Sequence, residues 1–226
     1  MPFRLNSPER IAQALAVLCL VILIVLGGKP DFTNASQPVR GIHDPGIALQ
    51  VARNVEEVDA ILGPAPSADR EAMRLKQYID FAFIATYVGI ALAIAASVKR
   101  MRPVAVALLL CVLAAGVFDC MENLAILRLL PVNLTDTSQS MIDAIARPSR
   151  VKWLLTSLAL ILLSIFFFRS RRWYLRLLAA WDLGAGGLTC FGVFHNDWLP
   201  WAAGLLSAGL ILSAATLNLL THESAS

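Results

Sequence analysis

Charged residues are scarce in this chain: of 226 residues only 15% are Asp, Glu, Lys or Arg, while 58% are hydrophobic. A water-soluble globule with so little charge would expose large apolar patches. The mean hydropathy of +0.67 points the same way. The composition therefore excludes a soluble fold and predicts an integral membrane protein that sits in the lipid bilayer.

An excess of one charge sign is also missing, because the net charge is only +3. The basic residues gather in short loops, which is typical of the positive-inside bias of membrane proteins. A nucleic-acid partner is therefore not expected.

Residues and motifs that would hold a metal or run a known reaction are few. All four cysteines fall inside apolar runs without CxxC spacing, where cysteine behaves as a small hydrophobe. They are Cys19, Cys111, Cys120 and Cys190. The three histidines, His43, His195 and His222, lie at or beyond the ends of the apolar runs, so a Glu-x-x-His di-metal site is not expected. Glycine-rich nucleotide loops, HExxH and serine-elbow patterns are absent too. We expect no disulfide framework, no metal and no cofactor.

Long apolar runs are what the chain does have. Six of them are long enough to cross about 30 Å of hydrocarbon as helices. They cover residues 9–27, 78–98, 104–130, 151–168, 177–194 and 201–220. The predicted fold is an all-α, polytopic transmembrane helix bundle, forming a single domain over residues 1–226. The first run also resembles a cleavable signal peptide, but the helix start at Ser7-Pro8 and the lack of an Ala-x-Ala site favour a retained span.

The one sizeable polar region, residues 29–77, is predicted to be an amphipathic helical segment outside the membrane. Asp44-Pro45 is typical of a helix start. Asn54 and Glu57 have the spacing of a capping box, so the segment forms either one helix or two short helices with a break near Arg53. Ser67 can cap a further helix that continues from water into the second span. We favour a cover that lies on the membrane surface or on the helix ends over a lid on the polar residues of the third span.

Orientation follows from the basic loops. If both termini lie inside, three basic clusters face the cytoplasm: the chain start, Lys99–Arg102 and Arg169–Arg176. This orientation places one basic cluster, Arg147, Arg150 and Lys152, on the outside. The opposite orientation would place the other three basic clusters there. The glycosylation sequons at Asn34 and Asn133 would then lie outside.

The third span contains acids that a lipid-facing helix would not tolerate. Asp119, Glu122 and Asn123 have i, i+3 and i+4 spacing, which places them on one helical face. Ionised carboxylates facing lipid cost about 2.5 kcal/mol or more each, so this stripe is expected to face other helices or a hydrated cavity. Both a functional site and an ionic lock between helices remain open.

The predicted topology brings further charges to the depth of this stripe. The second and fourth spans enter from the same side, so Lys152–Glu122 and Arg128–Asp80 pairs are expected. The candidate cluster comprises Asp80, Asp119, Glu122, Asn123, Arg128 and Lys152. Asp182 in the fifth span lies beside Gly184, Gly186 and Gly187, which favours close helix packing over a second site.

Four short segments together resemble a family of uncharacterised bacterial polytopic membrane proteins. They are Asp44-Pro45-Gly46-Ile47 with the following helix to Gly63, Asp80-Phe81-Ala82-Phe83-Ile84 with Tyr87, Asp119-Cys120-Met121-Glu122-Asn123, and Lys152-Trp153. The resemblance covers about residues 44–168 and leaves the last two spans outside. It implies a bacterial cytoplasmic membrane and a shared helix core, without an assigned reaction.

These observations favour a non-enzymatic role as a scaffold, accessory subunit or small-ligand binder. A membrane-protein partner or a homo-oligomer is compatible with that role. The alternative is a proton- or cation-coupled transporter, or a membrane enzyme, that uses Asp119 and Glu122.

Overall fold

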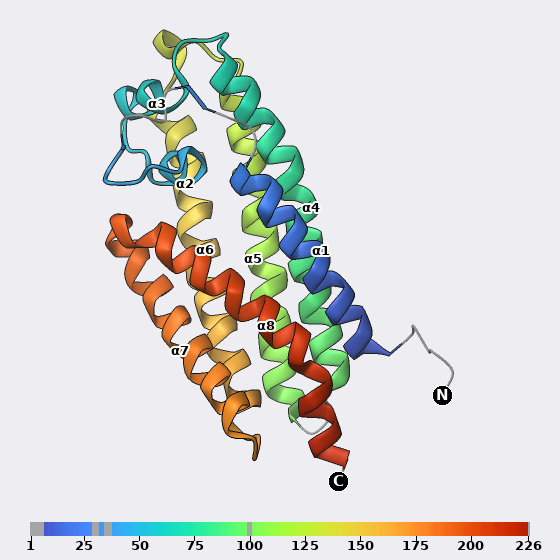
Figure 1. Ribbon diagram of the computed structural model, residues 1–226. Coiled ribbons are helices and arrows are strands. Elements are labelled where there is room, and N and C mark those ends of the chain that lie inside the picture. Colours follow the sequence, from blue (N-terminus) through green and yellow to red (C-terminus); the bar gives the residue numbers. More distant parts are fainter. Residues whose placement is uncertain (1–6, 29–31, 34–37, 99–100, 226) are drawn as a thin grey trace.

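The computed structural model describes residues 7–28, 32–33, 38–98 and 101–225. Within these ranges the protein is an all-α bundle, and six of its helices are long and apolar enough to cross a membrane. They are α1 (Pro8–Gly28), α4 (Ala68–Ser97), α5 (Arg102–Leu129), α6 (Gln139–Phe168), α7 (Trp173–Phe194) and α8 (Leu199–Ala225). Figure 1 shows them side by side, with the start of α1 and the end of α8 at the same end of the bundle. The predicted fold class is confirmed.

The long helices are apolar around most of their circumference. Between 22% and 44% of the most apolar stretch of each is buried inside the protein, so the rest presents hydrophobic side chains outward. This is the composition of a helix whose surroundings are hydrocarbon rather than water. The core between the helices is built largely from small and aliphatic residues, and Ala12, Ala115 and Ala179 have no exposed surface.

Two short helices, α2 (Pro45–Val51) and α3 (Val55–Leu62), cover one end of the bundle (Figure 1). The Asp44 carboxylate accepts a hydrogen bond from the Ile47 amide, and the Asn54 side chain accepts one from the Glu57 amide. The predicted helix start at Asp44 is therefore confirmed, and of the two alternatives the structure shows two short helices with a break near Arg53. We call residues 38–67 the cover, and the end of the bundle beneath them the cover end.

The cover is attached to the bundle by Arg70, a buried arginine in the first turn of α4. Its guanidinium donates hydrogen bonds to the carbonyls of Gly63, Leu129, Leu130 and Val132, at 2.8–3.3 Å. Backbone carbonyls at the end of α5 have no hydrogen-bond donor within their own helix. The planar guanidinium, with several N–H donors, can bind more than one of them at once. The cover, the start of α4 and the end of α5 are thus tied together.

The fourth predicted span begins too late. The sequence predicts a polar connection up to Arg150, whereas α6 starts at Gln139 and runs without a break through Pro148. The extra turns are held by burial of Ile142 and Ile145 in an apolar cluster with the cover and the end of α5. Tertiary packing here overrides the helix-breaking tendency of proline.

Candidate functional site

Lys152 on α6 joins two acids of the α5 stripe. Its Nζ lies 2.8 Å from Asp119 Oδ1 and 2.6 Å from Glu122 Oε2. The three side chains are between 1% and 7% exposed, so both ion pairs are shielded from solvent. The predicted Lys152–Glu122 pair is present in the structure, and Asp119 is a second partner of the same ammonium group.

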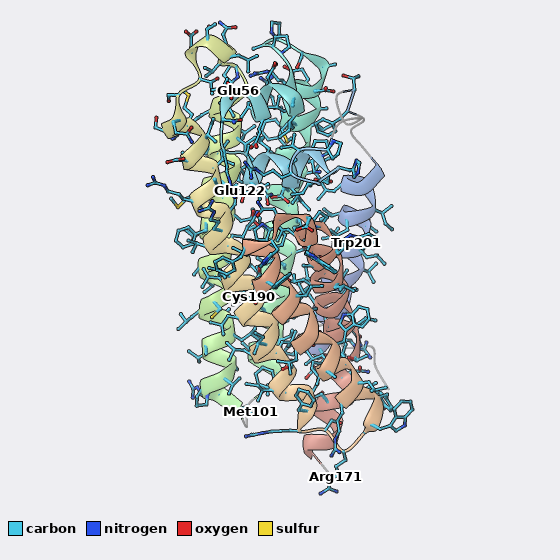
Figure 2. The ribbon with its side chains drawn as sticks, turned by 90° about the vertical axis from the view of Figure 1, so that its left-hand side faces the viewer. Glu56, Met101, Glu122, Arg171, Cys190 and Trp201 are labelled. Atoms are coloured by element: carbon cyan, nitrogen blue, oxygen red, sulfur yellow. The ribbon has the colours of Figure 1, made fainter. Side chains whose placement is uncertain are left out.

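Two neutral hydroxyl groups complete the coordination of these carboxylates. The Tyr87 hydroxyl on α4 donates to Asp119 Oδ2 at 3.1 Å, and the Ser149 hydroxyl on α6 donates to Glu122 Oε2 at 2.7 Å. Buried carboxylates are tolerated when opposite charge and hydrogen-bond donors surround them. The arrangement therefore connects α4, α5 and α6 at one depth in the bundle. Figure 2 shows this depth: along the length of the bundle, Glu122 lies between Glu56 and Met101.

Asp80 on α4 has a different environment. Its Oδ2 accepts a hydrogen bond from the Asn123 amide at 2.7 Å. Among the described residues it has no ion-pair partner. Asp80 is half-buried and borders a cavity, so this carboxyl group faces the cavity without an ion-pair partner in the part of the chain that the structure describes.

The predicted Arg128–Asp80 pair is wrong. Arg128 is exposed on α5, and its side chain makes no ion pair within the described ranges. Arg128 follows Asn123 by five residues, which on a helix of 3.6 residues per turn rotates it away from the stripe by more than a quarter turn. The other five predicted residues, Asp80, Asp119, Glu122, Asn123 and Lys152, are brought together.

The cover closes over the polar cluster. Lys76 Nζ on α4 lies 3.0 Å from Asp44 Oδ2 at the start of α2. The indole of Trp153 donates to the Gln50 side chain of α2 at 2.9 Å. The cover contacts helix ends, as predicted, and α2 also borders the cavity above the cluster.

A cavity of about 540 Å³ extends from this cluster into the bundle. This volume lies within the range of about 300–1,000 Å³ that is usual for small-molecule sites. Its walls come from α1, α2, α4, α5, α6 and α8. The polar or charged residues at its cover end are Asp44, Gln50, Lys76, Gln77, Asp80, Tyr87, Asp119, Asn123 and Lys152.

Each of the three central helices changes from polar to apolar along this cavity. On α4 the lining runs from Lys76 through Asp80 to Ile94, and on α5 from Asn123 to Leu108. On α6 it runs from Lys152 to Leu163. Fourteen residues separate Asp80 from Ile94, so the cavity follows α4 for about 21 Å at 1.5 Å per residue. The result is a long apolar chamber with a charged end.

Asp182, the acid predicted to mark close packing, lies outside this cavity. It is fully buried on α7, and Ser213 of α8 donates to its Oδ2 at 2.8 Å. A Cβ at Gly186 would meet the Ser157 carbonyl oxygen at 2.9 Å, so this glycine does serve helix packing. Gly184 and Gly187 face open space, and the packing prediction is wrong for these two.

Sequence reasoning did not place Tyr87, Ser149 or Gln50 in the site. Tyr87 lies seven residues after Asp80, and Ser149 three residues before Lys152, so both share a helical face with a predicted cluster residue. That spacing was the available signal. No sequence signal points to Gln50, because its contact with α6 depends on how the cover folds back.

The donor set does not suit a resident metal ion. Among the residues that the structure describes, no group of three or more His, Cys, Asp or Glu side chains is arranged to hold a metal. The ammonium of Lys152 occupies the position between the two nearest carboxylates. The cluster is therefore arranged as an ionic network beside a cavity.

Comparison with known proteins finds no matching family model, curated protein or solved structure. The class of the protein therefore rests on its fold and site: it is a multi-pass, all-α membrane protein with a buried ionic network at one end of a cavity between its helices.

Proposed function

We propose that this membrane protein is a non-enzymatic binder of a small amphiphilic ligand, held in the cavity between α1, α4, α5, α6 and α8. The observation that carries the proposal is the change from a charged end to an apolar chamber within one cavity. Amphiphiles have the same division, with a polar head and a hydrocarbon tail. Ligand sites generally combine a mainly apolar lining with a few placed polar groups.

In this proposal the ligand enters the cavity from the surrounding bilayer. Gly204 on α8 borders the cavity, is exposed, and has no atom within 4 Å of the position of an added Cβ. The cavity wall is therefore thin at this point of α8, whose outer face is apolar. We place an entry path from the membrane beside Gly204.

The transporter or membrane-enzyme alternative has less support. Asp119 and Glu122, the acids it would use, already bind Lys152, Tyr87 and Ser149. A scaffold or accessory role, with a membrane-protein partner or a second copy, does not call for a cavity of this kind. A bacterial cytoplasmic membrane, with both termini in the cytoplasm, and kinship with the uncharacterised bacterial family remain part of the proposal.

Trp153 offers a direct test, because its ring borders the cavity. In a variant with Trp153 as the sole tryptophan, reconstituted in phosphatidylcholine nanodiscs, a dibrominated C16 alcohol should quench the fluorescence in a saturable manner. Gly204→Leu and Ala203→Leu narrow the cavity and should weaken this binding at least tenfold. Gly187→Leu is the matched control, since Gly187 also faces open space but lies on α7 away from the cavity.

The result that overturns the proposal is equally clear. Quenching that rises linearly with probe concentration, or that is equal in the Trp153-only protein and in its Gly204→Leu and Gly187→Leu variants, reports only partition into the bilayer. Proton uptake or cation-dependent stabilisation that disappears in Glu122→Gln would favour the alternative instead.

A further inference from the structure

The charges around the cavity specify the chemistry of the ligand head group. The cavity end and the adjoining network hold four acids, Asp44, Asp80, Asp119 and Glu122, and two amines, Lys76 and Lys152. If all are ionised, two negative charges are in excess. An anionic head group would add to that excess, whereas a cationic one would reduce it.

The distribution of partners points to one acid in particular. Lys152 is paired with Asp119 and Glu122 in buried contacts, and Lys76 is paired with Asp44 in a part-exposed one, so an anionic ligand would have to compete with a carboxylate for either amine. Within the described ranges of the chain, the Asn123 amide is the one hydrogen-bond partner of the Asp80 side chain, which borders the cavity. A carboxylate that receives one neutral donor and faces a largely apolar space gains most from a cation.

From this geometry we infer that the cavity binds a single-chain amphiphile with a cationic amine head, the ammonium pairing with Asp80 and the tail extending toward Ile94, Leu108 and Leu163. The inference rests on the proposed function. It adds the sign of the head group and the residue that selects it.

The shape of the cavity supports a single chain. Its extent of about 21 Å along α4 exceeds half of the roughly 30 Å hydrocarbon core, so an extended tail of membrane-lipid length fits lengthways. A volume of about 540 Å³ belongs to the small-molecule range and holds one chain rather than a whole two-chain phospholipid. Both a free long-chain amine and a one-chain lipid with an amine head satisfy this description.

Competition against the brominated alcohol tests the inference in the Trp153-only protein. Three competitors share a C16 chain and differ only in the head: hexadecylamine, hexadecanol and hexadecanoate. In neutral phosphatidylcholine nanodiscs we expect the amine to displace the probe at a concentration at least tenfold lower than the alcohol, and the acid to be the weakest. A one-chain phosphoethanolamine lipid in a parallel titration separates the lipid source from the free amine.

Asp80→Asn is the decisive variant, because the amide keeps an oxygen that can accept from Asn123 while losing the charge. It should reduce the amine's advantage over the alcohol at least tenfold. Asp59→Asn, an equal change at an exposed acid of the cover outside the cavity, should keep the full preference. Comparing variants in one membrane cancels partition of the competitors into lipid.

The outcomes separate this inference from the proposed function. Saturable binding of all three chains with no amine preference, or with a preference that survives in Asp80→Asn, overturns the head-group assignment and leaves the binder intact. Preference for the acid overturns it as well. No saturable binding of any chain overturns both proposals.

Discussion

Lys152→Met is the substitution that the structure predicts to be most costly. It removes one ammonium and leaves two carboxylates, Asp119 and Glu122, that are 7% and 1% exposed. Breaking a buried ion pair from one side costs about 3–5 kcal/mol, because the charge left behind has no compensation. Tyr87 and Ser149 still donate to the two acids, but neutral donors replace only part of a cation's stabilisation.

The assay is reversible unfolding in detergent micelles or nanodiscs, followed by circular dichroism. A loss of about 3–5 kcal/mol corresponds to a midpoint lower by about 6–20 °C, at roughly 2–4 °C per kcal/mol for a chain of this length. Arg128→Met is the control. That arginine is exposed without an ion pair among the described residues, so its removal should shift the midpoint by less than about 2 °C, as is usual at surface positions.

Removing every charge of the network should restore most of the stability. From the sequence, Glu122→Gln with Lys152→Met would suffice for a near-neutral replacement of a complete pair. The structure adds Asp119 as a second partner, so the triple variant with Asp119→Asn is needed. Equal stability of wild type and Lys152→Met would refute the reasoning, and so would a triple variant less stable than Lys152→Met.

Three further predictions concern other parts of the bundle. Arg70→Lys should lower the free energy of unfolding by about 1–3 kcal/mol in the same assay, because one ammonium group cannot reach all the carbonyls that accept hydrogen bonds from the guanidinium. Arg70→Met should lower it by at least as much. Gly186→Val should cost about 1–3 kcal/mol through its clash with the Ser157 carbonyl, while Gly187→Val, facing open space, should be tolerated; equal effects would contradict the α6–α7 contact. In a glycosylating host the exposed sequon at Asn133 should be glycosylated if the cover end lies outside the cytoplasm. A correctly inserted chain without glycan at Asn133 would reverse the proposed orientation. The second sequon, at Asn34, lies outside the described residues.

Much of the fold is determined by composition and periodicity alone. The apolar runs specify the spanning helices, since hydrocarbon leaves the backbone no partner other than its own helix. The starts of α2 and α3 follow from side chains that bind their own backbone, which is a local interaction. The Asp119, Glu122 and Asn123 stripe is local too, because helical spacing decides which residues share a face.

Only the tertiary structure decides which partner each polar group finds. Long side chains at equal depth can pair in several ways, so the sequence predicts Lys152–Glu122 only as one option. The predicted Arg128–Asp80 pair does not form because Arg128 lies on the outer face of α5. The cavity is even less visible in sequence, because it is the space that six elements leave between them rather than a property of any one. Hydrophobicity therefore determines that the helices span, and their mutual rotation and packing determine where charge and empty space meet.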